Sequence, residues 1–214
     1  MIIPVAAVLA VLAPVLTGGR LRRFAALRIR HGWVLGLALL AQVVVLEVTP
    51  DGHRTVLAAV HVVTYLAAGW FVWANRSVPG LLLIGLGAAS NGLAITLNGG
   101  TLPADPDALA TAGIDLDPDA FVNSGVLAAP RLAFLGDVFA IPAGWPLANV
   151  FSIGDVLIVA GVAWCAHRVC GSRLVPAWRP DGAPGDGELR SDGVPVDTLG
   201  TDAGSSRTQP WGAT

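Results

Sequence analysis

Long apolar runs separated by polar stretches make up most of this chain. Five of these runs are predicted to be helices, because each approaches the roughly 20 residues that a helix needs to cross a bilayer. A polar segment, residues 98–149, separates the fourth run from the fifth, and residues 171–214 are mainly small and polar. The five runs cover residues 2–17, 33–48, 55–74, 79–97 and 150–169.

This pattern predicts an all-α fold, a polytopic membrane helix bundle of five transmembrane helices with a long outer loop between helices 4 and 5. Residues 1–170 would form the membrane domain, and residues 171–214 a disordered cytoplasmic tail. Composition agrees, since the mean hydropathy is +0.66 and only 13% of residues are charged, against about 25% in soluble domains. The net charge of −2 gives no reason to expect nucleic acid. The expected partners are membrane lipids and another membrane protein.

The placement of arginine predicts which way the helices face. Arginines are concentrated between the first and second runs and again after the fifth, whereas residues 98–149 are acidic and hold one base, Arg131. Because basic loops stay in the cytoplasm, the N-terminus is expected outside the plasma membrane and the C-terminus inside. The first run has no positive charge before it, which argues against a cleaved signal peptide. All 13 basic residues are arginine, which indicates a GC-rich bacterial genome and an inner-membrane protein.

Two similar phrases, residues 134–138 and 151–156, place Asp137 and Asp155 in or beside the outer segment. Ser152 and Asp155 have the spacing of a helix capping box, which would explain Asp155 without any function. Ionisable groups at a membrane boundary are costly unless they are paired or used. Asp137 and Asp155 are therefore also candidate catalytic carboxylates, for acid-base chemistry or for holding a divalent cation.

Polar residues near the outer ends of the fourth and fifth helices form a candidate ligand or partner surface. Asn91 and Asn98 are seven residues apart and would share a helical face, while Asn98-Gly99-Gly100 is also typical of a helix C-cap. If Arg131 paired with a carboxylate, that group would be structural. The candidate surface comprises Asn91, Asn98, Gly99, Gly100, Arg131, Asp137, Asn149, Ser152 and Asp155.

A further polar pair, Glu47 and His61, is predicted at comparable depth in neighbouring spans. The pair would serve a proton relay or ligand site, or each residue would simply be hydrogen-bonded at the interface. Cys165 and Cys170 point in different directions on a helix, so no disulfide is expected. The sequence has no cluster of residues with metal-ligand spacing and no phosphate-loop or hydrolase motif, so it assigns no metal and leaves the cofactor unknown.

Several phrases together resemble a family of uncharacterised bacterial membrane proteins, domain of unknown function 5317 (DUF5317). They are the basic residues 17–22, Asn98-Gly99-Gly100-x-x-Pro103, Leu135-Gly136-Asp137 and residues 151–156. The resemblance covers about residues 1–170, and Leu102 stands where members often have Met. It implies several membrane helices with a long non-cytoplasmic segment. The resemblance implies no activity, cofactor or catalytic residue.

Three functions remain open from the sequence. The leading hypothesis is a non-enzymatic binding or accessory protein that uses its outer cap, residues 98–155, because the spans hold fewer polar groups than those of a typical transporter. The second is a membrane enzyme acting at the outer interface through Asp137 and Asp155. The third is a proton-coupled carrier working through Glu47 and His61.

Overall fold

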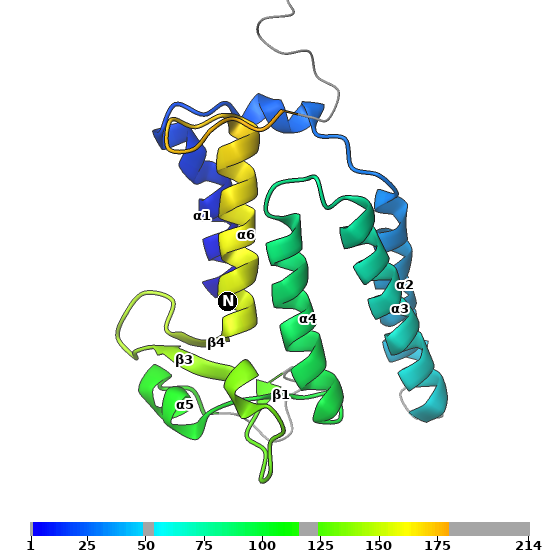
Figure 1. The fold of residues 1–214 in the computed structure, drawn as a ribbon. Helices are drawn as coiled ribbons and strands as arrows, with labels where there is room; N and C mark the ends of the chain where they lie inside the picture. Colours follow the sequence, from blue (N-terminus) through cyan, green and yellow to red (C-terminus); the bar gives the residue numbers. More distant parts are fainter. Residues whose placement is uncertain (1, 49–53, 116–123, 180–214) are drawn as a thin grey trace, which may run out of the picture. The chain divides into compact units, whose positions relative to one another are not determined.

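A computed structural model describes residues 2–48, 54–115 and 124–179, most of which are helical (Figure 1). The chain divides into two units, Met1–Trp178 and Arg179–Thr214. The first unit extends past the expected boundary at Cys170, because Trp178 donates a backbone hydrogen bond to the carbonyl of Arg168. The rest of the predicted tail, beyond Arg179, lies outside the described residues.

Helices occupy all five predicted apolar runs. They are α1 (Ile2–Leu16), α2 (Gly32–Val48), α3 (Arg54–Ala74), α4 (Leu81–Leu97) and α6 (Ile153–Cys170). By length and composition, α6 alone among the described helices is suited to crossing a membrane, with 18 residues and a hydropathy of 1.5. The other apolar helices are shorter in their described parts, which are Ile2–Leu16, Gly32–Ala41, Val62–Ala74 and Leu81–Leu97. Helix length therefore does not by itself support five membrane spans.

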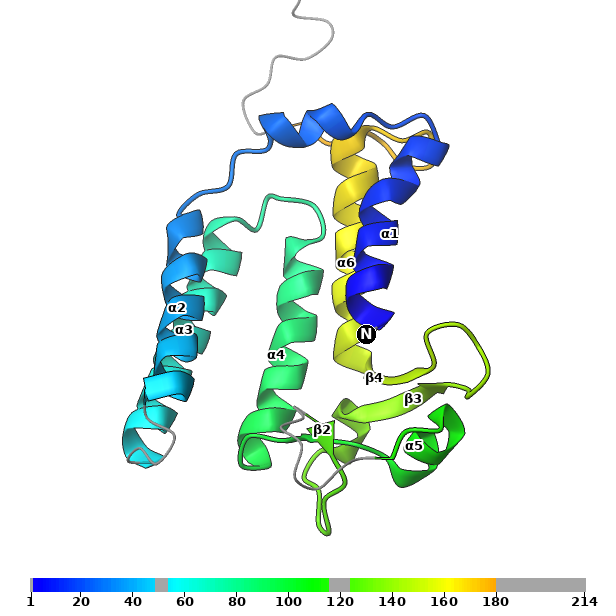
Figure 2. The same ribbon diagram turned by 180° about the vertical axis from the view of Figure 1, so that it is seen from behind.

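Glycines bring α4 and α6 into close contact along their length. The two helices lie side by side in both views (Figures 1 and 2). A Cβ atom added to Gly87 would collide with the carbonyl oxygen of Gly154, and one added to Gly161 would lie 2.8 Å from the carbonyl oxygen of Gly80. Small residues of this kind allow helix backbones to approach where a side chain would hold them apart. Helix α1 packs against α6 as well.

One end of the first unit brings together three segments (Figure 1). They are the arginine-rich connection between α1 and α2, which we call the basic connection, the turn between α3 and α4, and the end of α6. Asn75, only 2% exposed, accepts from the backbone N–H of Arg30 at 2.7 Å and donates to its carbonyl at 2.9 Å. The guanidinium of Arg23 donates to the carbonyl of Cys170 at 3.3 Å. The short 3-10 helix η1 (Leu21–Ala26) lies in this basic connection. Side-chain and backbone hydrogen bonds thus fix the end that carries most of the arginines.

The segment expected as an outer loop is a small α/β cap at the opposite end (Figure 2). Its elements are β1 (Leu102–Pro103), α5 (Pro106–Ala112), β2 (Ser124–Gly125), η2 (Ala133–Leu135), β3 (Asp137–Ile141) and β4 (Asn149–Ser152). Strand β1 pairs with β2 in parallel, and β3 pairs with β4 antiparallel. The all-α prediction is therefore wrong for the cap, although the chain as a whole is mostly helical.

The start of the last helix also differs from the prediction. Residues 149–152 form β4, and α6 begins at Ile153, three residues after the predicted start of the fifth span at residue 150. The Ser152 hydroxyl accepts from the backbone N–H of Asp155 at 3.1 Å, and the Asp155 carboxylate accepts from the backbone N–H of Ser152 at 3.0 Å. The predicted capping box is confirmed, and it sets the point where strand becomes helix.

Candidate functional site

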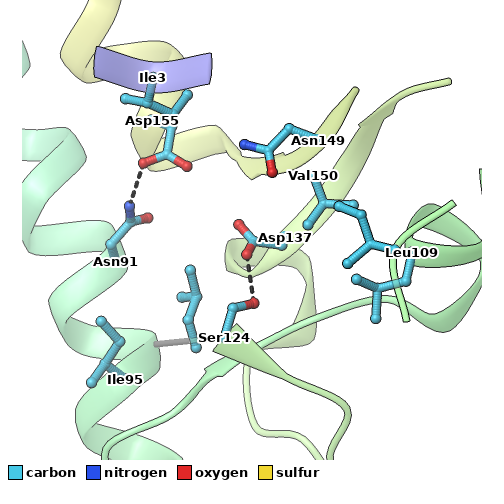
Figure 3. A pocket seen from close by; sticks show the side chains of 11 residues that line it. Ile3, Asn91, Ile95, Leu109, Ser124, Asp137, Asn149, Val150 and Asp155 are labelled. Atoms are coloured by element: carbon cyan, nitrogen blue, oxygen red, sulfur yellow. Dashed lines mark hydrogen bonds between the residues drawn. The ribbon is translucent and has the colours of Figure 1, made fainter. Parts of the chain in front are cut away.

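A cavity of about 400 Å³ lies where the cap meets the ends of α1, α4 and α6 (Figure 3). We name it the carboxylate cavity, because Asp137 and Asp155 are its ionisable residues. Its volume is within the ~300–1,000 Å³ usual for sites that hold small ligands. The lining residues are Ile3, Asn91, Ile95, Leu102, Leu109, Ile114, Ser124, Asp137, Asn149, Val150 and Asp155.

On the helical side of the cavity, Asn91 joins α4 to the first turn of α6. Its amide nitrogen donates to Oδ1 of Asp155 at 3.0 Å, and its amide oxygen accepts from the hydroxyl of Ser152 at 2.9 Å. Ser152 is fully buried. Because Asp155 also accepts from the backbone N–H of Ser152, both of its oxygens have a donor. The negative charge is stabilised by these bonds and by the positive end of the helix.

On the cap side, Asp137 is only 6% exposed and has fewer partners. The hydroxyl of Ser124 donates to its Oδ2 at 2.6 Å, and within the described chain its Oδ1 accepts no hydrogen bond. The same part of the structure places no cation in an ion pair with Asp137 or Asp155. Figure 3 shows both carboxylates and the amide of Asn149 turned toward one space. The cavity therefore exposes an acceptor to which no group of the described chain donates.

The surroundings of Asp137 shift the pKa of its carboxyl group. Burial raises the pKa of this carboxyl above its ordinary value, the hydrogen bond from Ser124 opposes the rise, and the negative charge of Asp155 adds to it. The two carboxylates thus sit in different environments: within the described chain the Asp155 carboxylate accepts from two groups, the Asn91 amide and the Ser152 backbone N–H, and the Asp137 carboxylate accepts from the Ser124 hydroxyl alone. Such a difference is common where a protein binds a ligand or moves a proton.

Close backbone packing positions Asp137 at the start of β3. A Cβ on Gly136 would collide with the carbonyl of Pro103, so only glycine permits this approach. Asp137 bridges to Ala104 in parallel and pairs with Ser152 across an irregularity in the β3–β4 ladder. The phrases around Pro103, Gly136 and Ser152, which are distant in sequence, therefore meet at the cavity wall.

The predicted ligand surface divides into two groups. Asn91, Asp137, Asn149, Ser152 and Asp155 gather at the cavity, four of them lining it and Ser152 bonding to Asn91. The remaining residues lie at the end of α4, outside the cavity lining: the Asn98 amide donates to the carbonyl of Arg131 at 2.7 Å and accepts from its backbone N–H at 2.8 Å, next to Gly99 and Gly100.

The asparagine and two glycines at the end of α4 have a structural role. Asn98 is the C-cap of α4, and Gly99 and Gly100 have φ of +70° and +104°, which glycine adopts without strain. The predicted C-cap is confirmed. Arg131 contributes backbone groups to this join, and its guanidinium pairs with neither carboxylate among the described residues. Asn91 therefore bonds to Asp155 and Ser152, whereas Asn98 bonds to the backbone of Arg131.

The remaining predictions concern residues that are not among the described lining of the cavity. The side chains of Glu47 and His61 lie outside those that the structure describes, so their pairing stays a prediction. Cys165 and Cys170 are free thiols. Over residues 2–48, 54–115 and 124–179, no group of three or more His, Cys, Asp or Glu side chains could hold a metal ion.

Sequence reasoning missed Ser124 and the apolar lining residues Ile3 and Leu109. Ser124 stands in a two-residue strand with no periodic pattern, so nothing local marks it as a partner of Asp137. Leu109 lies on α5, whose Asp105 N-cap and Pro106 are a recognisable helix start. That signal would have predicted α5 within the acidic segment, although not its position over the cavity.

Comparison with known proteins places the chain in a family. The sequence model of the family of unknown function DUF5317 matches residues 26–166. The chain belongs to this family. The matched part of the DUF5317 chain includes both carboxylates and Asn91, whereas Ile3 precedes it. The resemblance inferred from the short phrases is confirmed.

A relative of this DUF5317 chain gives no further function. An uncharacterised protein of Thermotoga maritima is 30% identical over 93 residues, which are 44% of this chain and 53% of the relative. The chain therefore spans about half the length of the curated relative that it matches. No solved structure matches the chain.

Proposed function

We propose that this DUF5317 chain is a multi-pass membrane protein whose carboxylate cavity binds a small ligand that donates hydrogen bonds. The single observation that carries the binding role is Asp137: a nearly buried carboxylate, bonded through one oxygen and facing an open volume with the other. A hydrogen bond to a charged group contributes about 1.5–3 kcal/mol. A ligand that donates to the second oxygen of Asp137 would gain a bond of this kind.

Surface hydrophobicity supports the membrane part of the proposal. Leu39 on α2 is 67% exposed and Leu66 on α3 is 68% exposed, and many other large apolar side chains on the helices are also uncovered. Soluble proteins rarely expose apolar patches larger than a few hundred Å². At the arginine-rich end, Arg76 lies 4.7 Å from the ring of Trp73. Tryptophan beside arginine is typical of a cytoplasmic membrane interface.

The proposed topology puts the cap outside and the arginine-rich end in the cytoplasm. Alkaline phosphatase, which is active only outside the cytoplasm, is expected to be active when fused at Gly144 in the cap and inactive when fused at Ser77 in the α3–α4 turn. A green fluorescent protein fused after Arg179 is expected to fluoresce, since it would remain in the cytoplasm. The reverse pattern at Gly144 and Ser77 would contradict the proposed orientation, and activity at both positions would contradict the membrane crossing by α4.

Ligand retention tests the binding role directly. Native mass spectrometry of the protein released gently from its own membrane is expected to reveal a bound small molecule. Asp137→Asn is expected to weaken its binding about 10- to 100-fold, because a hydrogen bond to a charged group contributes about 1.5–3 kcal/mol. Asp107→Asn is the matched control, since Asp107 is exposed on α5 and lines no part of the cavity.

Two results of this experiment would contradict the binding role. One is equal retention of the small molecule by the wild type and by Asp137→Asn. The other is a stoichiometric second polypeptide with no small molecule, which would favour the accessory role instead.

A membrane enzyme is the second candidate, favoured by the contrast between the two carboxylates. Burial raises the pKa of Asp137, and Asp155 lies in a different hydrogen-bonding environment; two carboxyl groups in unlike environments can divide the roles of proton donor and proton acceptor. An enzyme would convert the bound molecule, so its mass would change during incubation of the wild type and not of Asp137→Asn. A binding protein would retain a molecule of constant mass.

A further inference from the structure

A second cavity, of about 330 Å³, runs between α1 and α6 next to the carboxylate cavity. We name it the α1–α6 groove. On α1 it is lined by residues such as Ile2 and Ala6, and on α6 by residues such as Val159 and Ala160. Every lining residue except Asp155 is apolar. A groove of this composition accepts hydrocarbon and offers no partner to a polar chain.

The two cavities are neighbours that share part of their walls. Ile3 and Asp155 line both of them, and Figure 3 shows the two side chains together at the edge of the carboxylate cavity. The α1–α6 groove is thus apolar up to Asp155, and beyond Asp155 the lining of the carboxylate cavity adds polar side chains, among them Asn91 and Asp137. A single molecule that occupied both would need a hydrocarbon part and a polar end.

Charge determines what the polar end should be. Asp137 and Asp155 line the carboxylate cavity, and no lysine, arginine or histidine is among the lining residues that the structure describes. A phosphate, sulfate or carboxylate head would meet two acidic groups without a cation. A primary ammonium carries the complementary charge and three donors. Its donors match the free Oδ1 of Asp137 and the side-chain oxygen of Asn149, for which no donor is present within the described chain.

We propose that the ligand of this site is a single-chain amphiphile, with its alkyl chain in the α1–α6 groove and a primary ammonium in the carboxylate cavity. The proposal rests on the proposed binding function and specifies its ligand class. In a membrane, such a molecule would enter along α1 and α6 from the lipid phase. Its head would meet the cap at the end of α6, where Asp155 begins the polar wall.

The test uses the full chain in nanodiscs of phosphatidylcholine, a lipid without a primary ammonium. The probe is dodecylamine with a photoreactive diazirine on its chain, and the measurement is saturable labelling followed by peptide mapping. Labelling is expected on the α6 peptide and near Ile2, with an affinity at least about tenfold above that of propylamine measured by competition. Dodecyltrimethylammonium, which has the charge without donors, and dodecyl phosphate, which is anionic, are expected to compete poorly.

Two matched variants distinguish labelling by dodecylamine bound in the groove from labelling by dodecylamine dissolved in the surrounding lipid. Ala160→Phe is expected to lower labelling at least about tenfold by filling the groove, since Ala160 lines it and is exposed. Ala88→Phe makes the same change at an exposed position of α4 that lines neither cavity, and it should leave labelling unchanged. Asp137→Asn is expected to weaken both dodecylamine and propylamine.

The outcomes distinguish failure of the amphiphile proposal from failure of the proposed small-ligand binding. One outcome is that propylamine binds in an Asp137-dependent way while the alkyl chain of dodecylamine adds no affinity, and another is that Ala160→Phe leaves labelling unchanged. Either result excludes the amphiphile and leaves the binding role standing. If neither amine depends on Asp137, the ammonium head is excluded. If native mass spectrometry also finds no ligand that depends on Asp137, the binding role fails as well. Equal labelling in the Ala88 and Ala160 variants, without saturation, would mean only partition into lipid and would overturn the proposal.

Discussion

Gly87→Ala is expected to destabilise the protein by about 1–3 kcal/mol, because the added methyl group overpacks a tight helix contact. Its Cβ would collide with the carbonyl oxygen of Gly154 and lie 2.9 Å from Cγ1 of Ile158. The neighbouring atoms include backbone, so α4 and α6 would have to separate. Since these helices carry Asn91 and Asp155, the separation would also open the carboxylate cavity.

Gly36→Ala provides the control for this prediction. A Cβ on Gly36, in α2, would meet no atom within 4 Å. Alanine favours a helix over glycine by about 0.5–1 kcal/mol, so this variant should be as stable as the wild type or slightly more stable. The free energy of unfolding is compared by titration with dodecyl sulfate in mixed micelles. Equal stability of the Gly87 and Gly36 variants would show that the α4–α6 contact is looser than the structure has it.

Removal of the Asn91 amide is expected to have a comparable effect. Asn91→Ala would leave Oδ1 of Asp155 and the hydroxyl of Ser152 without their partner on α4. A hydrogen bond to a charged group contributes about 1.5–3 kcal/mol, and the loss should be of that size. Because the amide joins α4 to the start of α6, the variant should also lose binding in the carboxylate cavity.

A double-mutant cycle isolates the bond between the two side chains. Asn91→Ala, Asp155→Ala and the double variant are compared by the same titration. A coupling energy of about 1.5–3 kcal/mol is expected, whereas additive effects within about 0.5 kcal/mol would mean that the bond contributes little. Asn98→Ala is a useful comparison, since Asn98 caps α4 and lines neither cavity. It should lower stability while binding in the cavity persists.

The helices were predictable from the sequence because their signals are local. Long apolar runs place α1, α2, α3, α4 and α6 to within a few residues. The capping box at Ser152 and the glycine C-cap after Asn98 were also predictable, since both motifs form between residues close in sequence. The exact start of α6 was not, because the apolar residues Val150 and Phe151 adjoin the apolar run and become part of a strand only by pairing with β3.

The sequence predicted the two carboxylates of the candidate site but not the residues around them. Asp137 and Asp155 were recognisable as costly carboxylates near a membrane boundary. Ser124, which holds Asp137 in place, and Ile3, which joins the two cavities, carry no signal of their own. For Arg131, the sequence left open whether its guanidinium pairs with a carboxylate. In the structure its backbone groups bond to Asn98, and among the described residues its guanidinium pairs with neither Asp137 nor Asp155.

By itself, the sequence determined that this DUF5317 chain is built of apolar helices, where most of them begin and end, and which polar residues are expensive to keep at their ends. Only the tertiary structure decided that Asn91 bonds to Asp155 and that Asp137 faces the same cavity with an oxygen that accepts no hydrogen bond from the described residues. The reason is physical. Helix and cap signals act between near neighbours in the chain, whereas the cavity depends on glycine contacts between α4 and α6 and on the pairing of β3 with β4, which bring distant residues together.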